Sequence, residues 1–397
     1  DERGPVMATI LLCSFVIRYP VGGVLSNNLQ FLTGFKRLGH DVYLLEKAGY
    51  DDSCFDPERR ISSDDCSCGI RLANRLLDDH GLGGHLCYVA ADGSYHGMNR
   101  SETEAVIAAA DVFIDRGLHR TWDEETADVP LRILVDPDPG FRQVKMAKAA
   151  AAGRAHGRYD AYYTYGQNIG TERSDAPDAG VDWRHLFHPI DTRLYAPTVP
   201  RRGAACTTVM NWRPLETVGF DGRVFGMKDV QFPHFEDLPT MVTVPMEVAV
   251  EGPSVPRDRL AANRWNVVSA LDATSSYAAY HEYLRGSLAE FSVVKDVYSA
   301  LNVGWFSDRS AAYLAHGRPV IVQDNGIRHH LPTGEGLFEV GSVDQAAEAV
   351  ERVAREPERH ARAARRLAEE YLDVRPVLGR FLDELGIPSP DPDGGSP

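Results

Sequence analysis

The feature that most constrains the fold of this chain is a regular alternation of short apolar runs with longer amphipathic segments. The run TILLCSFVI (residues 9–17) is apolar almost throughout, which is typical of a strand buried on both faces of a parallel sheet. A glycine turn, RYPVGG, leads into a segment with Leu25, Leu29, Leu32 and Phe35 at helical spacing. The strand-like segment HDVYLLEK follows, and this order predicts a βαβ unit.

The alternation continues to about residue 200, pauses at a linker, PTVPRRG, and then restarts. We therefore predict two doubly wound α/β domains of Rossmann-like form that face each other across a cleft. Their predicted bounds are 7–200 and 205–375, followed by a helix over 376–388 that packs back on the first domain and a disordered tail over 389–397. The expected strands of the first domain are 9–17 and 40–47, followed by strands near Leu86, Phe113, Leu134 and Tyr162. Those of the second domain lie at about 206–212, 246–252, 265–271 and 318–324.

The composition narrows the function classes. The chain has 397 residues and a formal net charge of -15, which argues against a general binder of nucleic acids or membrane surfaces, because those anionic partners demand a local excess of Lys and Arg. The first apolar run is too short to span a bilayer and lacks the cleavage region of a signal peptide. The six cysteines follow no regular spacing, so we predict reduced thiols in a cytoplasmic protein.

Gly22 and Gly23 stand between the first strand and the first helix, where glycines let a phosphate approach a helix N-terminus. A tight turn without a ligand explains them equally well. The sequence contains no GxGxxG, GxxxxGK[ST], GxSxG or HExxH motif, which excludes several common nucleotide-binding and hydrolytic sites.

Two loops after predicted strands carry candidate catalytic groups. Asp136 and Asp138 follow the strand RILV, and an Asp-x-Asp pair at that edge can bind a divalent cation or form a plain Asp-Pro turn. Asp115 and His119 follow another strand, and an imidazole titrates near neutral pH, which suits a general base. An incidental loop histidine is the alternative reading of His119.

The segment FSDRSAAYLAHGRP predicts a helix capped by Ser307 and stopped by Gly317. Arg309 stands in its first turn, where the helix dipole disfavours a cation. Glu290, Lys295 and Arg309 are candidates to meet near one site, and the two cations predict an anion site at the start of this helix, although a plain ion pair is the alternative. Glu335, between two glycines at the end of a later strand, could reach a ligand hydroxyl.

The run GWFSDRSAAYLAHGRPVIVQD, followed by LPTGEG, resembles the donor domain of bacterial GT-B glycosyltransferases over about residues 280–337. YPVGG and LGHDV extend the likeness to the first half. The resemblance implies that the donor diphosphate contacts several residues and needs no metal. These residues are Gly22, Gly23, Lys295, Ser307, Asp308 and Arg309, with Glu335 and Gly336 near the ribose or sugar.

The chain departs from this family where many retaining members have two glutamates. Those positions hold Gly304 and Ala312, so an inverting course that depends on a base stays open. His119 is the preferred base, with Asp115 and Asp138 as alternatives. The predicted activity is transfer of a sugar from a nucleotide-diphosphate sugar to a small-molecule acceptor of a natural-product pathway. A nucleotide-sugar epimerase and a non-catalytic nucleotide- or sugar-binding protein are the rival hypotheses.

Overall fold

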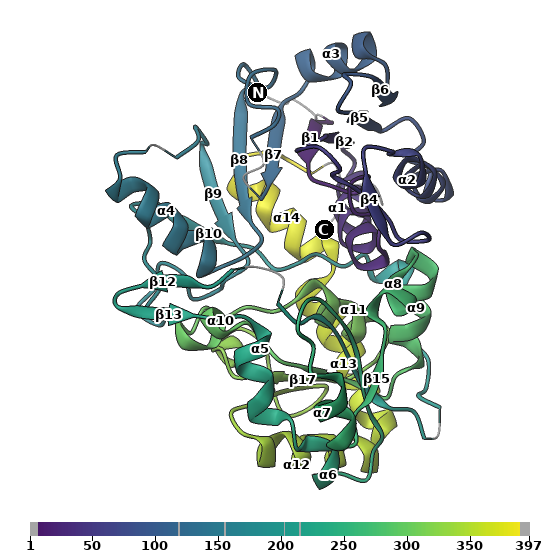
Figure 1. Cartoon of the computed structure of the whole chain (residues 1–397). Coiled ribbons are helices and arrows are strands. Elements are labelled where there is room, and N and C mark those ends of the chain that lie inside the picture. Colours follow the sequence, from purple (N-terminus) through teal and green to yellow (C-terminus); the bar gives the residue numbers. More distant parts are fainter. Residues whose placement is uncertain (1–6, 118–119, 155, 202, 214–215, 390–397) are drawn as a thin grey trace, which may run out of the picture.

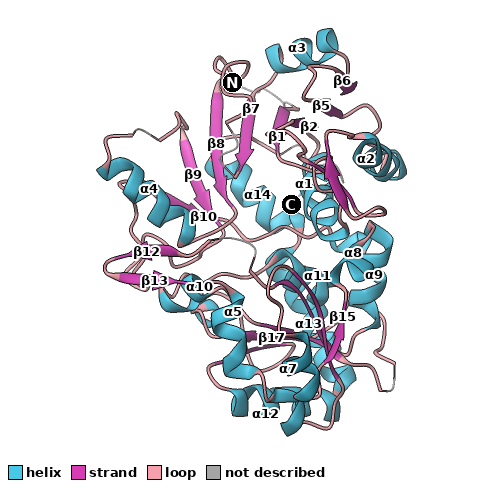
Figure 2. Ribbon diagram, viewed as in Figure 1, coloured by secondary structure: helices cyan, strands magenta, loops and turns pink. Residues whose placement is uncertain are grey.

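The computed structural model describes residues 7–389 except 118–119, 155, 202 and 214–215. Two α/β domains lie one above the other in Figure 1, and Figure 2 shows strands at the centre of each with helices around them. The tail predicted to be disordered, 389–397, lies outside the described residues apart from Ser389. No helix in the described part of the chain is long and apolar enough to cross a membrane.

Within the described residues, the first domain contains an eight-stranded sheet in the order β10-β9-β8-β7-β1-β2-β5-β6, parallel except for β5–β6. The strands are β1 (Thr9–Cys13), β2 (Asp41–Lys47), β5 (Leu86–Val89), β6 (Tyr95–Gly97), β7 (Val112–Arg116), β8 (Leu131–Asp136), β9 (Ala161–Thr164) and β10 (Trp183–His185). Its helices are α1 (Gly22–Arg37), α2 (Ser67–Asp79), α3 (Arg100–Ala108) and α4 (Phe141–Ala151), and a hairpin is formed by β3 (Cys54–Asp56) and β4 (Ile61–Ser63).

The second domain has a parallel sheet in the order β15-β14-β11-β16-β17-β18. The strands are β11 (Cys206–Asn211), β14 (Met246–Glu251), β15 (Asn266–Val268), β16 (Ala289–Ser292), β17 (Val320–Gln323) and β18 (Leu337–Val340), with a hairpin of β12 (Val218–Phe220) and β13 (Arg223–Phe225). The helices are α5 (Lys228–Gln231), α6 (Leu238–Met241), α7 (Arg257–Ala262), α8 (Ala270–Thr274), α9 (Tyr277–Gly286), α10 (Asp296–Ala300), α11 (Asp308–Ala315), α12 (Val343–Arg355) and α13 (Pro357–Leu367).

The first strand is shorter than its apolar run predicts. β1 ends at Cys13, because the carboxylate of buried Glu46 accepts hydrogen bonds from the backbone N–H groups of Val16 (2.6 Å), Ile17 (2.7 Å) and Arg18 (3.0 Å). These bonds turn the chain away from the sheet and fix the loop that leads to α1. An apolar run alone does not reveal that a neighbouring strand supplies such an acceptor.

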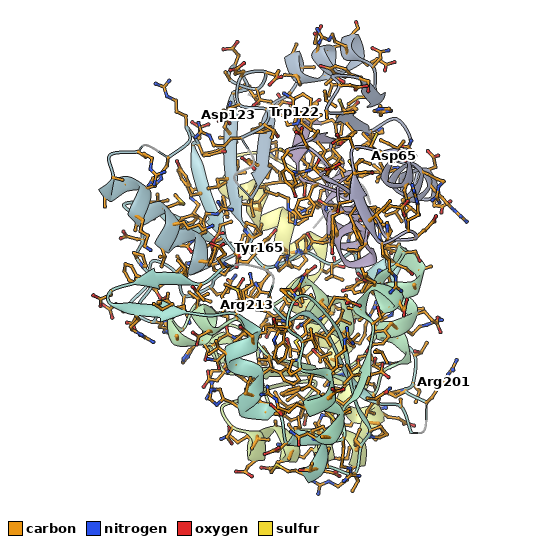
Figure 3. The ribbon with its side chains drawn as sticks, viewed as in Figure 1. Asp65, Trp122, Asp123, Tyr165, Arg201 and Arg213 are labelled. Atoms are coloured by element: carbon orange, nitrogen blue, oxygen red, sulfur yellow. The ribbon has the colours of Figure 1, made fainter. Side chains whose placement is uncertain are left out.

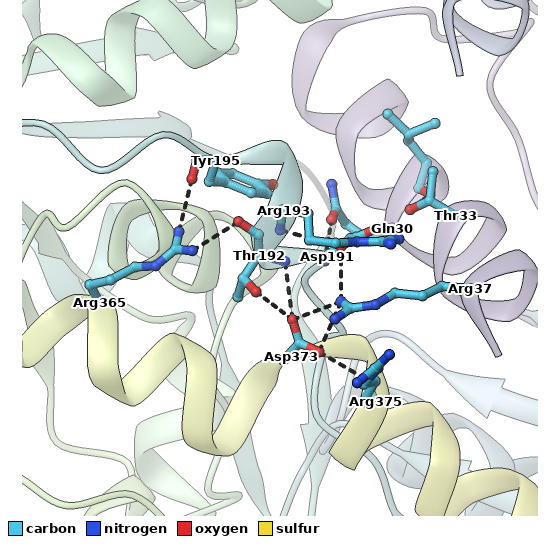
Figure 4. Close-up of polar contacts among 11 residues, drawn as sticks. Gln30, Thr33, Arg37, Asp191, Thr192, Arg193, Tyr195, Arg365, Asp373 and Arg375 are labelled. Atoms are coloured by element: carbon cyan, nitrogen blue, oxygen red, sulfur yellow. Dashed lines mark hydrogen bonds and ion pairs between the residues drawn. The ribbon is translucent and has the colours of Figure 1, made fainter. Parts of the chain in front are cut away.

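The chain crosses between the domains twice at one place, shown in Figure 4. Ile190, on the way to the second domain, forms a parallel bridge with Asp373, on the way back. The Asp373 carboxylate accepts hydrogen bonds from Arg37 (3.1 Å) and from the Thr192 hydroxyl (2.5 Å). This buried polar junction ties α1 to both crossing segments.

The last helix, α14 (Val374–Glu384), lies against the first domain although it follows the second in sequence. Its Phe381 packs against Phe35 of α1 and Tyr163 of β9. A side chain at Gly34 would begin 2.5 Å from Leu378, so glycine permits the close approach of α1 and α14. The helix begins at Val374, whereas the sequence predicts a start at 376.

Candidate active site

A cavity of about 490 Å³ lies between the two domains, at the carboxyl ends of strands from both sheets. In open α/β sheets ligands bind at this edge. Ser14 follows β1, Arg116 ends β7, and Asn211 and Glu251 end β11 and β14, and all four line the cavity. The geometry therefore selects this cavity as the candidate active site.

The start of α11 faces the cavity as the capping pattern predicts. The Ser307 hydroxyl accepts a hydrogen bond from the Ser310 backbone N–H (3.1 Å), and Ser307, Asp308 and Arg309 all line the cavity. Burial raises the pKa of Asp308, although Arg309 opposes that shift. Gly317 ends the turn with φ at 71°, the left-handed conformation that a stop requires.

Arg309 forms an ion pair with a carboxylate on another element, which the sequence pattern of its own helix does not reveal. Its Nε lies 2.5 Å from Oε1 of Glu290, a fully buried residue of β16, and its terminal nitrogens donate to the Val209 carbonyl (2.8 Å) and the Ser292 hydroxyl (2.9 Å). Burial disfavours the cation, but the Glu290 carboxylate outweighs this effect and raises the pKa of Arg309. The ion pair with Glu290 therefore offsets the unfavourable position of a cation in the first turn of α11. Arg309 also borders the cavity.

Lys228, at the first position of α5, is a cavity residue that the sequence reasoning missed. It is only 8% exposed, and no described residue forms a hydrogen bond or ion pair with its ammonium group. Burial, and then the nearby charge of Arg309, lowers the pKa of Lys228 well below the usual lysine value. Its sequence context, GMKDVQ, looks like an ordinary surface turn, so no local signal marks it. An anionic ligand would supply the missing partner.

Lys295, in contrast, contacts the first domain. Its Nζ lies 2.6 Å from Oδ1 of Asp138, which also accepts a hydrogen bond from the Tyr298 hydroxyl. Asp136 points into the protein, where Gln143 and Thr164 donate to it at 2.9 Å each. Burial raises the pKa of Asp136. The two aspartates thus do different work, and their arrangement does not suit a shared metal ion.

Asp115, a candidate base of the first domain, is not brought to the cavity. Asp115 is fully buried, accepts hydrogen bonds from the Tyr159 hydroxyl (2.6 Å) and the Arg120 backbone N–H (3.3 Å), and does not line the cavity. Its predicted role as a base therefore lacks access to an acceptor. His119 lies outside the described residues.

The neighbour of Asp115 along β7, Arg116, does reach the cavity. It donates to the side-chain oxygens of Asn27 and Asn28, the latter at 2.7 Å, and its guanidinium lies 4.1 Å from the ring centre of Phe31. Because a guanidinium can only donate, the Asn27 oxygen must face it, so the Asn27 amide nitrogen faces Nδ1 of His188 (3.2 Å). His188 also lines the cavity, and the sequence reasoning missed it.

The protonation of His188 follows from this arrangement. Burial, and then the charge of Arg116, lowers the pKa of His188 well below its usual value, so the ring is neutral. Its Nδ1 accepts from Asn27, and the proton therefore sits on Nε2. The ring stacks on Tyr165, with 3.6 Å between centroids, and Figure 3 labels Tyr165 where the two domains meet. In this tautomer His188 is a hydrogen-bond donor, not a general base.

The two glycines of the first turn play different parts. A side chain at Gly22 would begin 2.3 Å from the Ser276 carbonyl oxygen and 2.4 Å from Tyr280, so Gly22 permits α1 to contact α9 of the other domain. Gly23 lines the cavity, and only the Tyr280 ring, at 3.8 Å, lies near the place of its absent side chain. The expected approach to a phosphate is therefore open at Gly23 and closed at Gly22.

Glu335 and Gly336 do not belong to the cavity. Glu335 is paired with Arg359 of α13 on the surface, and Gly336 packs against Ala364 of the same helix. The prediction of a ribose contact there is not supported by their position. Two carboxylates of this domain do line the cavity among the described residues, Asp308 and Glu251, and Glu251 accepts a hydrogen bond from the Ser269 hydroxyl (2.6 Å).

One group of potential metal ligands exists in the described part of the chain, formed by Asp56, Glu58 and Cys68. It lies around the β3–β4 hairpin and α2, outside the cavity. Arg71 donates to Glu58 (2.9 Å) and to the Cys68 sulfur (3.4 Å), and burial raises the pKa of Cys68 to about 11. Arg71 already neutralises the Glu58 carboxylate that would bind a cation, and the raised pKa keeps the Cys68 thiol protonated. All six cysteines of the chain are free and buried.

No family model matches the sequence, and no curated protein matches it significantly. Solved structures match almost its whole length. HepE from Anabaena, in complex with UDP, matches over 96% of this chain and 100% of its own, with 12% identity and a TM-score of 0.54. A glycosyltransferase from Rickettsia africae matches over 95% and 97%, with 11% identity and a TM-score of 0.51. Sucrose-phosphate synthase from Thermosynechococcus elongatus matches over 97% and 99%, with 12% identity and a TM-score of 0.50.

The chain has the GT-B fold. This confirms the predicted fold class of two Rossmann-like domains facing across a cleft. The cavity between the two domains is lined by Lys228, Lys295 and Arg309 of the C-terminal domain. Arg116 and His188 of the N-terminal domain line it from the other side.

Proposed function

We propose that this protein is a glycosyltransferase that moves a sugar from a nucleotide-diphosphate sugar to an acceptor held by the first domain. The observation that carries the proposal is the buried Lys228 ammonium, which faces the cavity beside Arg309 and has no partner among the described residues. A buried charge without a partner is costly, and a diphosphate bound at this place would remove that cost.

The chemistry fits the charges around the cavity. Departure of a nucleoside diphosphate is the step that builds up negative charge, and preorganised cations and helix N-termini stabilise such charge. Lys228, Lys295 and the capped start of α11 converge there. Because these groups can supply the positive charge, we propose that the reaction needs no divalent metal.

Part of the cavity wall that would face the acceptor is apolar. Phe15, Tyr19 and Val24 line it from the first domain and Leu271 lines it from the second. Such a wall suits a small molecule with a ring or an apolar body, and we propose a natural product, made in a bacterial cytoplasm, as the acceptor class. His119 is the proposed base if the reaction inverts the anomeric centre.

Binding and turnover test the proposal separately. UDP is the first nucleotide to try, since the HepE structure contains it, followed by GDP, TDP and ADP in the same calorimetric titration. Lys228→Met should lower the affinity for the preferred nucleotide by about 10- to 100-fold, because a charge-assisted contact is lost. Lys145→Met, on the exposed face of α4, is the matched control. An unchanged affinity in Lys228→Met would refute the diphosphate assignment.

The reaction products distinguish a glycosyltransferase from an epimerase and from a non-catalytic binding protein. A glycosyltransferase releases nucleoside diphosphate in proportion to glycosylated acceptor, and a panel of ring-containing alcohols and cell extracts provides acceptors. Conversion of the nucleotide-sugar to an isomer without any acceptor would favour an epimerase. Tight nucleotide binding with no turnover on any donor would favour a binding protein.

A further inference from the structure

Arg116 is a buried cation whose charge no described carboxylate neutralises. It is 7% exposed, and its partners are the neutral side chains of Asn27, Asn28 and Tyr165 and the face of Phe31. Burial of a charge is tolerated when the charge is paired or fully hydrogen-bonded. Each terminal nitrogen of Arg116 donates to an asparagine, and the Tyr165 hydroxyl is a further neutral acceptor. Nε has no partner among the described residues, so the guanidinium keeps donor capacity that these residues do not use.

Two other buried arginines show how this chain satisfies such a group elsewhere. Arg132, at 8% exposure, forms an ion pair with Asp123 (2.8 Å). Arg318, at 1%, donates to the carbonyl oxygens of Arg285 and Thr198 and to the Thr198 hydroxyl, so neutral acceptors surround it. Neither lines the cavity. Of these three arginines, Arg116 alone borders the cavity.

The groups beside Arg116 add donors, not acceptors, on the cavity side. The oxygens of Asn27 and Asn28 are both turned to the guanidinium. His188 is held by Asn27 with its Nε2 proton free of any described partner. The amide nitrogen of Asn28 is used by the Phe15 and Val24 carbonyls (3.2 and 3.0 Å), so it is not available to a ligand. A guanidinium next to an imidazole N–H is suited to an anion with planar oxygen atoms.

We propose that Arg116 and His188 form a second anion subsite, which binds a carboxylate of the substrate. The proposal rests on the proposed glycosyl transfer and names a property of its substrates. A carboxylate fits better than a phosphate, because Arg116 supplies one positive charge here and the cations of the second domain serve the diphosphate. The carboxylate can belong to the acceptor or to a uronic acid sugar on the donor, and these two sources are distinguished by experiment.

Asp308 is the competing partner for Arg116. It lies across the cavity at the start of α11, and the positive charge of Arg116 acts on it, but no ion pair joins the two residues in this arrangement of the domains. If Asp308 came to neutralise Arg116 as the domains close, the arginine would be a latch between the domains and would show no preference for an acidic ligand.

The test compares ligands that differ only in a carboxylate. For the donor, UDP-glucuronic acid is compared with UDP-glucose, and for the acceptor, benzoate is compared with benzamide in the presence of saturating UDP, all by calorimetry at matched ionic strength. We expect a preference for the acid of about tenfold or more in one pair, as a charge-assisted contact provides. Arg116→Gln should abolish it.

Asn27→Asp is the second variant, and it guards against a failure of Arg116→Gln to fold. Asn27 is only half-buried, and an aspartate there would neutralise Arg116 with little change of shape. Its second oxygen would also replace the amide N–H that faces Nδ1 of His188, which moves the ring proton to Nδ1 and removes the Nε2 donor. It should abolish the preference for the acid while UDP alone binds as before. Arg132→Gln removes an equally buried arginine outside the cavity and should keep the preference.

Each outcome decides. A preference in the donor pair that both variants lose assigns the carboxylate to the sugar, and a preference in the acceptor pair assigns it to the acceptor. Equal binding of acid and neutral ligands by the unmodified protein, or a preference that survives both variants, overturns the subsite. If UDP binds but acids are not preferred, the carboxylate subsite is overturned and the proposed function stands. If no nucleotide binds but benzoate is preferred over benzamide in the absence of UDP, the proposed function is overturned and the subsite stands.

Discussion

Lys295 of the second domain donates a hydrogen bond across the cleft to Asp138 of the first, with 2.6 Å between Nζ and Oδ1. The contact joins a residue expected to bind the donor with one considered as a base. Both side chains are mostly buried, at 17% and 19% exposure. The importance of this pair is that a diphosphate would have to compete with Asp138 for the lysine.

We therefore expect Asp138→Asn to strengthen UDP binding by up to about fivefold, because the lysine is released and a negative charge is removed. Calorimetry measures the change. Asp136→Asn is the control, since that carboxylate is buried among Gln143 and Thr164 and its loss should lower the melting temperature without strengthening UDP binding. Weaker UDP binding by Asp138→Asn would show that the pair helps to form the site.

The Arg309–Glu290 pair leads to a second prediction, about stability. Removal of the arginine leaves Glu290 buried and uncompensated, so Arg309→Met should lower the free energy of unfolding by about 3–5 kcal/mol. The double variant Arg309→Met, Glu290→Gln should recover most of the loss in urea denaturation, because no charge is then left alone. If the single and double variants are equally unstable, the ion pair is not the cause.

The two glycines of the first turn make a matched pair. Gly22→Ala places a methyl group 2.3 Å from the Ser276 carbonyl oxygen, which must push α1 away from α9. Gly23→Ala meets only the edge of Tyr280 at 3.8 Å, an ordinary contact. We expect Gly22→Ala to cost about 1–3 kcal/mol of stability, as overpacking does, and Gly23→Ala to cost less than 1 kcal/mol. Thermal denaturation of both variants checks this, and equal costs would contradict the packing described for Gly22.

His281 and His316 predict a dependence of stability on pH. Nδ1 of His281 lies 3.1 Å from Nε2 of His316, and burial lowers the pKa of each to about 3. In the unfolded chain both titrate near 6.5, so between pH 6.5 and 3 the unfolded state binds more protons and stability falls as the pH falls. The pair should remove about 3 kcal/mol between pH 6.5 and pH 5.

Urea denaturation across that pH range measures the effect as a slope. The double variant His281→Gln, His316→Gln should flatten the slope by nearly two protons, whatever its absolute stability. His329→Gln, at an exposed position, should leave it unchanged. A slope that the double variant does not alter would mean that the two histidines are accessible to protons in the folded protein.

The fold class could be predicted from local sequence patterns alone. Continuous apolar runs, helical spacing at Leu25, Leu29 and Leu32, and a second block of the same kind after residue 205 indicate two parallel α/β domains, because local pattern sets the type of each element. The cap at Ser307 and the stop at Gly317 are likewise local, and both were predictable.

The tertiary structure decided which side chains meet. Arg309 forms an ion pair with Glu290, and Glu335 forms one with Arg359. Asp115 accepts a hydrogen bond from Tyr159, and in each case the partner is far away in sequence. The pairing of charges depends on distance in space, which periodicity does not encode. Only the fold shows that Lys228 and Arg116, unremarkable in sequence, are the buried cations left facing the cavity without a described counter-ion, because burial and partners are properties of the packed chain.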